Sequence, residues 1–367
     1  MNQGERRPID YAMLCADTII KLFPAADLPP KGRFHYHQGV LLSGFERTYS
    51  LTQKEEYAQY VKDWVDSQIA PDGSVINYRA YELDGMMAGI LLFDLYDATG
   101  DIRYKKPLDV FIDNLKSWKL TPDGGFWHML HHTHQMWLDG FYMASPLLVR
   151  YALRFGEDEL FDTACRQMLL MWEHMRDEDT GLLYHAWDQS KQASWSDPET
   201  GLSSEFWGRA MGWYAVAAVD IAEMLPPERS DRQKYIDIAV ALLQSLSKYQ
   251  EPQTGLWYQV VDQGERPDNW LESSCSALYT YALSKALRCG WLDSGYRETA
   301  DRGYQGVIQM METDGETYLH VPRICVGTCL GDYKFYVNRP VQTNMLIGVG
   351  AFLLMCNEYQ LLTDMEE

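Results

Sequence analysis

Two aspartates in this sequence stand among apolar side chains, where a carboxyl group is costly unless it has a partner or a task. Asp84 lies in the segment YELDGMM, residues 81–87, and Asp139 lies in WLDGFY, residues 137–142. Apolar neighbours raise a carboxyl pKa by desolvation, and a carboxylic acid that stays protonated near neutral pH can act as a general acid. A helix N-terminus lowers the same pKa, so the sign of the shift stays open. The alternative for each aspartate is a plain helix N-cap.

A second group of side chains could hold a sugar. Arg209 and Trp213 are four residues apart in FWGRAMGW, residues 206–213, and therefore share one face of a helix. A guanidinium can pair with a carboxylate, and an indole can stack on a sugar ring. The alternative is a structural cation–π contact between the two side chains. Two other acidic residues, Asp94 and Asp220, fall deep or late in their helices, where we expect ion pairs or interhelical hydrogen bonds.

The histidines are unevenly distributed. Four of the nine lie in HMLHHTH, residues 128–134, and another, His185, lies in YHAWD, residues 184–188. A metal site is one interpretation, but no cysteine and only Asp139 accompany the cluster, and the segment has the composition of a turn rather than of one helix face. We therefore expect no metal, with His128 supplying a neutral hydrogen-bonding group to a ligand.

These candidates must be positioned by helices, because amphipathic stretches of helix length fill the sequence and strict alternation is rare. A recurring turn glycine followed by aromatics separates helix pairs, and it occurs six times, at Gly32, Gly73, Gly124, Gly181, Gly255 and Gly315. Helices before the glycines have a charged side and are predicted to be outer ones, as at 53–69, 103–118 and 232–249. Helices after the glycines are more apolar and are predicted to be inner ones, at 37–49, 84–96, 135–153, 206–224, 271–287 and 341–359.

Six inner and six outer helices in alternation predict an all-α fold, an (α/α)6 barrel formed by residues 1–367 as a single catalytic domain. Every inner helix then runs in the same direction, so six helix N-termini meet at one end, which we call the mouth. Each N-terminus carries roughly half a positive charge, which favours an anionic ligand such as an acidic sugar. An α-solenoid is the alternative, although its repeats are normally shorter and more regular.

Charge and composition exclude several classes of protein. The chain has 32 basic and 52 acidic residues, a net charge of −20, which disfavours nucleic acid as a partner. No stretch approaches the roughly 18 apolar residues of a membrane span, and the start, MNQGERRPIDYAML, has no apolar signal region. Seven scattered cysteines, an odd number without a C-x-x-C pair, indicate free thiols. We expect a cytoplasmic protein without a membrane partner.

Four segments together are similar to one known family. They are GFWH (125–128), MWLDGFYMA (136–144), GLLYHAWD (181–188) and FWGRAMGW (206–213), and the order of helices extends the likeness over nearly the whole chain. In these the chain resembles the unsaturated rhamnogalacturonyl hydrolases, which are related to the unsaturated glucuronyl hydrolases. One departure is Ala210-Met211, where the family more often has glycine and asparagine, and it bears on substrate choice rather than on the reaction.

The resemblance implies an (α/α)6 barrel in the cytosol that needs no cofactor. Its substrate would be an oligosaccharide that a polysaccharide lyase has left with a C4=C5 double bond in the terminal uronic acid. By position, Asp139 matches the family's proton donor and Asp84 its second acidic residue. The positions that match its substrate-binding residues are His128, Trp137, His185, Trp207, Arg209 and Trp213.

The implied chemistry is hydration of the double bond. Asp139 would protonate C4, a water activated by Asp139 or Asp84 would add to C5, and the resulting hemiketal would open and release the rest of the oligosaccharide. Two alternatives stay open. A sugar 2-epimerase would use paired histidines on opposed inner helices, and a non-catalytic glycan-binding barrel would keep the tryptophans and the arginine without needing Asp139.

Overall fold

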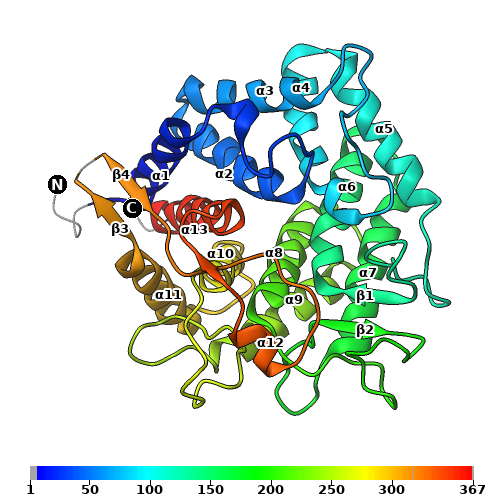
Figure 1. Ribbon diagram of the computed structural model, residues 1–367, viewed down its shortest axis with the longest axis vertical. Coiled ribbons are helices and arrows are strands. Elements are labelled where there is room, and N and C mark those ends of the chain that lie inside the picture. The colour runs from blue at the N-terminus through cyan, green and yellow to red at the C-terminus, as the bar shows by residue number, and fades with distance from the viewer. Residues whose placement is uncertain (1–5, 316, 366–367) are drawn as a thin grey trace.

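The computed structural model describes residues 6–315 and 317–365. Twelve long helices alternate between an outer and an inner position (Figure 1). The outer helices are α1 (Pro8–Leu22), α3 (Glu55–Gln68), α5 (Ile102–Lys116), α7 (Glu159–Met175), α9 (Arg232–Ser247) and α11 (Arg297–Met310). The inner helices are α2 (Tyr36–Thr52), α4 (Leu91–Thr99), α6 (Leu138–Phe155), α8 (Gly208–Met224), α10 (Ser273–Arg288) and α13 (Leu346–Asp364).

The inner helices form a closed ring. Helix α2 contacts α13, which contacts α10, then α8, then α6, and the ring closes through a 3-10 turn, η3 (Met87–Ile90), that touches both α6 and α2. In Figure 1 the outer helices α1, α3, α5 and α11 lie at the periphery, with α13 and α10 nearer the centre. The predicted all-α fold, an (α/α)6 barrel, is confirmed. Helix α13 is also the one described helix long and apolar enough to cross a membrane, and most of it is buried inside the barrel.

All six predicted turn glycines have positive φ, between 62° and 99°. A side chain is strained in that conformation, and glycine is not. At Gly255 space adds a second constraint, because a Cβ there would lie 2.3 Å from the carbonyl oxygen of Arg302. The glycines therefore mark the places where the chain turns from an outer helix into the ring.

The second inner segment departs from the prediction. Instead of one helix over 84–96 it forms two 3-10 turns, η2 (Leu83–Gly85) and η3, before α4 begins. Close packing explains part of the irregularity, because a Cβ on Gly89 would lie 2.9 Å from the ring of Phe111. Asp84 is consequently carried on a short turn rather than at the start of a long helix.

Four other inner helices, α6, α8, α10 and α13, begin two to five residues later than predicted, because a short strand or a loop precedes each of them. Strand β1 (Gln135–Trp137) pairs antiparallel with β2 (Ala186–Asp188), and β5 (Ile324–Cys325) pairs with β6 (Val341–Gln342). A third pair, β3 (Glu312–Asp314) and β4 (Tyr318–His320), lies beside α1. A short helix, α12 (Tyr333–Val337), lies between β5 and β6 in the chain. The strand pair β1–β2 holds the segment before α6 against the segment that follows α7.

Candidate active site

The two predicted aspartates lie at the mouth, each nearly buried. Asp84 is on η2 and its side chain is 13% exposed, while Asp139 is in the first turn of α6 and is 14% exposed. The negative charge of Asp139 is among the causes that raise the pKa of Asp84, so the two carboxyls lie within electrostatic reach of each other. The structure therefore brings together two carboxyls that the sequence separates by 55 residues.

The surroundings of Asp84 keep its carboxyl protonated. Burial first, and then the negative charges of Asp139 and Glu82, raise its pKa to about 8. Two imidazoles lie close, with Nε2 of His128 3.6 Å and Nε2 of His35 3.8 Å from the carboxyl oxygens. Burial lowers the pKa of His128 to about 4 and that of His35 to about 2. Both imidazoles are therefore neutral near pH 7 and do not offset the loss of solvation at Asp84.

Asp139 has the opposite shift. Burial would raise its pKa, but a hydrogen bond from His185, the charges of His185 and His128, and its own backbone N–H lower it overall. Nε2 of His185 lies 3.0 Å from Oδ2 of Asp139, and Nδ1 lies 2.7 Å from the hydroxyl of Tyr336. When Nε2–H donates to Asp139, Nδ1 is free to accept from Tyr336. The sequence left open the sign of the pKa shift of Asp139, and the fully buried imidazole of His185 sets it.

The predicted tryptophans pack around these acids and imidazoles. Trp137 stacks on His128, with ring centroids 4.4 Å apart. Trp207 lies 4.7 Å from the ring of His185 and stacks on Tyr336 at 5.8 Å. The indole nitrogen of Trp207 is buried and has no hydrogen-bond partner among the described residues. Aromatic packing thus fixes the orientation of both histidines that approach the carboxyls.

Trp213 and Arg209 each pack against other aromatic rings, and that they face one sugar stays a prediction. Trp213 stacks on Tyr142, with ring centroids 4.8 Å apart, and its other ring neighbour is Tyr36 at 6.4 Å. Arg209 lies over Trp207, with 4.6 Å from its guanidinium carbon to the ring centroid. The cation–π contact exists, but its aromatic partner is Trp207, two residues before the arginine.

The guanidinium of Arg209 is buried and already engaged. It donates to the carbonyl oxygens of Cys325, at 2.5 Å, and Val326, at 2.6 Å, and it lies 3.9 Å from Glu272. Glu272 in turn accepts from the backbone N–H of Cys325 at 2.9 Å. The pair therefore clamps strand β5 from both sides, which is a positioning role for Arg209. Its predicted pairing with a substrate carboxylate stays a prediction.

The structure adds site residues that the sequence reading missed. His35 and Tyr36 lie three and four residues after the first turn glycine, Gly32, so their position after that glycine was an available signal. Tyr336 comes from α12, 151 residues after His185, and nothing in its local sequence marks it. Cys329 also belongs to the mouth, because the charges of Asp139 and Asp84 act on its thiol and raise its pKa, together with burial.

The remaining histidines of the 128–134 cluster have aromatic neighbours. His132 stacks on Trp137 at 5.0 Å, and His134 lies 4.8 Å from Trp127. Within residues 6–315 and 317–365, no group of three or more His, Cys, Asp or Glu side chains could hold a metal ion. The cluster is therefore a packed aromatic loop that carries His128 toward Asp84.

Comparison with known proteins supplies a family. The model described as Glycosyl Hydrolase Family 88 matches residues 11–363. Unsaturated rhamnogalacturonyl hydrolase YesR of Bacillus subtilis is 28% identical over 307 residues, which cover 80% of this chain and 79% of that protein. Protein Atu3128 of Agrobacterium fabrum is 30% identical over 236 residues, 60% of this chain and 99% of its own length.

A solved structure agrees with these matches in fold and in sequence. The family 105 glycoside hydrolase of C. acetobutylicum superposes with a TM-score of 0.91 at 35% identity, covering 95% of this chain and 99% of that one. The unsaturated glucuronyl hydrolase of Bacillus sp. GL1 superposes with a TM-score of 0.69 at 17% identity, a likeness that extends to the fold alone.

Proposed function

This chain belongs to glycosyl hydrolase family 88, and on that premise we propose that it removes the terminal unsaturated uronic acid from oligosaccharides left by a polysaccharide lyase. One observation carries the proposal: two buried carboxyls at the mouth have opposite pKa shifts, with Asp84 raised to about 8 and Asp139 lowered. Near neutral pH one is an acid with a proton to give and the other is a base. Membership of a hydrolase family favours this reaction over the epimerase and the non-catalytic barrel.

The reaction that suits this pair is hydration of the C4=C5 bond. The Asp84 carboxyl gives its proton to C4, and water adds to C5 as its own proton passes to Asp139. The product is a hemiketal at C5, whose ring opens to a C5 ketone and leaves a hemiacetal at C1. The hemiacetal then releases the remaining oligosaccharide as an alcohol. One water is consumed, and the proton on Asp139 returns to Asp84 through solvent.

The resemblance in sequence implies Asp139 as the proton donor, and the ionisation states favour the opposite assignment. The hydrogen bond from His185 stabilises the ionised form of Asp139, whereas no N–H or O–H among the described residues donates to Asp84 at hydrogen-bond distance. We therefore propose Asp84 as the acid and Asp139, oriented by His185 and Tyr336, as the base. Infrared difference spectroscopy tests this: at pH 6.5 the protonated carboxyl absorbance of Asp84→Asn should be lower than that of Asp139→Asn by the share of one carboxyl.

We propose rhamnogalacturonan fragments as the substrate class, on the similarity to YesR. His128, Trp137, His185, Trp207 and Trp213 would form the sugar-binding surface, and Arg209 would act through the β5 segment that it clamps. Lyase digests of rhamnogalacturonan and of a glycosaminoglycan should be assayed side by side. The ultraviolet absorbance of the conjugated double bond should fall, and deuterium from heavy water should enter C4. Equal rates on saturated and unsaturated uronides would contradict the mechanism.

We also propose that residues 1–367 act as one catalytic unit in the cytoplasm. All seven cysteines are free thiols, and five of them are buried. Such a set suits a reducing compartment better than a secreted protein. Fractionation of cells with an antibody to this chain would test the location.

A further inference from the structure

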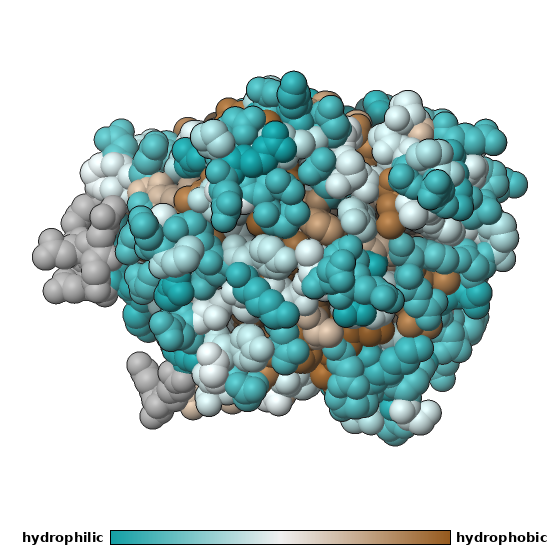
Figure 2. All heavy atoms as spheres, turned by 90° about the horizontal axis from the view of Figure 1, so that it is seen from below, coloured by the Kyte–Doolittle hydropathy of each residue, from teal (hydrophilic) through white to brown (hydrophobic). Residues whose placement is uncertain are grey.

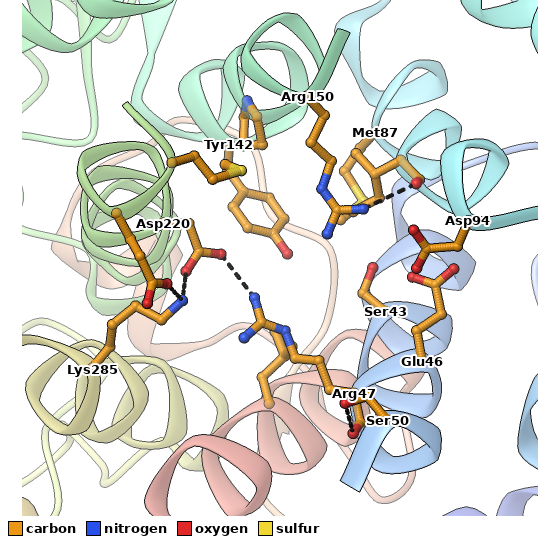
Figure 3. A pocket seen from close by; sticks show the side chains of 15 residues that line it. Ser43, Glu46, Arg47, Ser50, Met87, Asp94, Tyr142, Arg150, Asp220 and Lys285 are labelled. Atoms are coloured by element: carbon orange, nitrogen blue, oxygen red, sulfur yellow. Dashed lines mark hydrogen bonds and ion pairs between the residues drawn. The ribbon is translucent and has the colours of Figure 1, made fainter. Parts of the chain in front are cut away.

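A cavity inside the barrel extends toward the end opposite the aspartates. Its volume is about 280 Å³, and we call it the basal cavity (Figure 3). Helix α6 connects the two ends, because Asp139 stands in its first turn and Arg150, which lines the cavity, follows eleven residues later. Eleven residues of helix span roughly 16 Å. Most of the basal cavity therefore lies away from the mouth. Its lining residues nearest the aspartates in the chain are Met87 and Tyr142, three residues after Asp84 and Asp139, and Tyr142 is stacked on Trp213.

One wall of the basal cavity is internally paired. Lys285 lies 2.7 Å from Asp220 and 2.8 Å from Glu223, and Arg47 lies 3.1 Å from Asp220. The hydroxyl of Tyr281 also donates to Asp220. These groups satisfy one another, so this wall holds the ring together without requiring a ligand.

The other wall carries polar groups that lack partners among the described residues. Arg150 donates one hydrogen bond, from Nη1 to the carbonyl oxygen of Ile90 at 3.2 Å, and no carboxylate lies within 4 Å of it. The carboxyls of Glu46 and Asp94 and the hydroxyl of Tyr142 make no hydrogen bond. Figure 3 shows Arg150 and Tyr142 pointing into the cavity, with the carboxyls of Glu46 and Asp94 side by side on the facing wall.

The charge of this wall is balanced without an added ion. Burial and the neighbouring Asp94 raise the pKa of Glu46 to about 8, so Glu46 is neutral near pH 7. The positive charge of Arg150 then faces the single negative charge of Asp94. A cation would leave the four remaining N–H groups of Arg150 unused, and an anion would meet the acceptors of Glu46 and Asp94. A neutral molecule that both donates and accepts hydrogen bonds satisfies every group.

We propose that the basal cavity binds a neutral monosaccharide. Adjacent sugar hydroxyls would accept from the guanidinium of Arg150 and from the hydroxyl of Tyr142, and they would donate to the carboxyls of Glu46 and Asp94. The volume of the cavity is of the order that a single sugar ring requires. The proposal stands apart from the proposed hydrolysis, because none of its contacts involves Asp84 or Asp139.

Crystals of the whole chain soaked in D-galactose, and in parallel in L-rhamnose, test the proposal. Sugar density in the basal cavity, in contact with Arg150 and Asp94, is the expected result. Binding is then measured by calorimetry for the wild type, Arg150→Met and Asp94→Asn. Each variant should weaken the basal event on the order of tenfold, the effect of losing a charge-assisted hydrogen bond. Hydrolysis by both variants should stay within twofold of wild type.

A matched control is Asp97→Asn on the same helix. Asp97 pairs with Arg154 at 2.6 Å and does not line the basal cavity, so its loss should leave sugar binding unchanged. Water alone in the cavity at saturating sugar, or sugar only at the mouth, would overturn the proposal. Tighter binding of D-galacturonate or glycine than of both neutral sugars would also overturn it. Unfolding curves of each variant separate a loss of binding from a loss of folding. Asp94 is solvent-exposed, so Asp94→Asn is the variant expected to disturb folding least.

Discussion

The two ends of the barrel carry the same electrostatic motif with different partners. At the mouth, burial and Asp139 raise the pKa of Asp84 to about 8, and at the base, burial and Asp94 raise the pKa of Glu46 to about 8. The difference lies in the second carboxyl. Asp139 accepts a hydrogen bond from His185, and Asp94 makes none. Each end thus has one buried carboxyl whose pKa is raised by a neighbouring carboxyl, and only at the mouth does the neighbour have a hydrogen-bond donor among the described residues.

The direction of the inner helices explains which side chains accompany each pair. The mouth collects helix N-termini, whose partial positive charge favours carboxylates such as Asp139 in the first turn of α6. The base collects C-termini, whose partial negative charge favours cations, and there Arg47, Arg150 and Lys285 lie late in α2, α6 and α10. A chain with a net charge of −20, whose surface is largely hydrophilic in the view of Figure 2, therefore places three cations beside carboxyls inside its barrel.

The largest expected effect separates the two pairs by activity. Asp139→Asn and Asp84→Asn should each lower kcat on the order of 10²-fold to 10⁴-fold, because each removes a positioned acid or base. Asp94→Asn, the matching change at the base, should stay within twofold of wild type. Loss of double-bond absorbance, measured on lyase-treated rhamnogalacturonan, compares the three variants. If Asp139→Asn stays within tenfold of wild type, Asp139 has only a structural role in the first turn of α6 and the proposed mechanism is wrong.

The next effect concerns the partner that distinguishes the mouth. His185→Phe keeps an aromatic ring but removes the hydrogen bond that lowers the pKa of Asp139. The base would then be protonated at higher pH, so the acidic limb of the kcat/KM profile should move to higher pH. Tyr336→Phe, which removes only the contact to Nδ1 of His185, should move the limb less and in the same direction. An unmoved acidic limb in His185→Phe would show that Asp139 is not the titrating base.

Arg209 separates positioning from binding at the mouth. Arg209→Lys replaces a guanidinium that donates to two carbonyl oxygens with a single ammonium group. A charge-assisted hydrogen bond contributes roughly 1.5–3 kcal/mol. We expect the free energy of unfolding in urea to fall by about that amount, with KM of the folded enzyme nearly unchanged. A KM raised by one to two orders of magnitude at unchanged stability would instead place the guanidinium on the substrate carboxylate.

The sequence predicted the parts of this molecule that repeat and the side chains that stand next to them. All six turn glycines adopt positive φ, and Asp84, Asp139, His128 and His185 meet at the mouth. The two histidines each lie four residues after a turn glycine, and the two aspartates lie at or near the start of the inner segment that follows one, so the periodic pattern located them.

What the pattern could not supply were contacts between distant segments. Tyr336 reaches His185 across 151 residues, and Arg209 reaches strand β5 across more than 100. The sign of the Asp139 pKa shift depends on the His185 contact, so it could not be predicted either. Asp94 was expected to form an ion pair or an interhelical hydrogen bond, and that expectation was wrong, because it stands unpaired beside Glu46. The same expectation for Asp220 is confirmed, because Asp220 forms ion pairs with Arg47 and Lys285.

The smallest expected effect is the dependence of folding stability on pH that Glu46, in the basal cavity, contributes in addition to that of Asp84 at the mouth. A carboxyl whose pKa is raised by folding binds its proton more tightly in the folded state than in the unfolded state. For Glu46 this holds between its ordinary value of 4.5 and about 8, so its contribution to stability falls as pH rises through that window.

Glu46→Gln cannot ionise, and it should be more stable than wild type at pH 8 but not at pH 4. Urea unfolding at the two pH values measures this, and kcat, which depends on Asp84 and not on Glu46, should stay unchanged. An equal stability difference at both pH values would mean that Glu46 is already ionised in the folded protein, which would remove the neutral acceptor on which the basal sugar site depends.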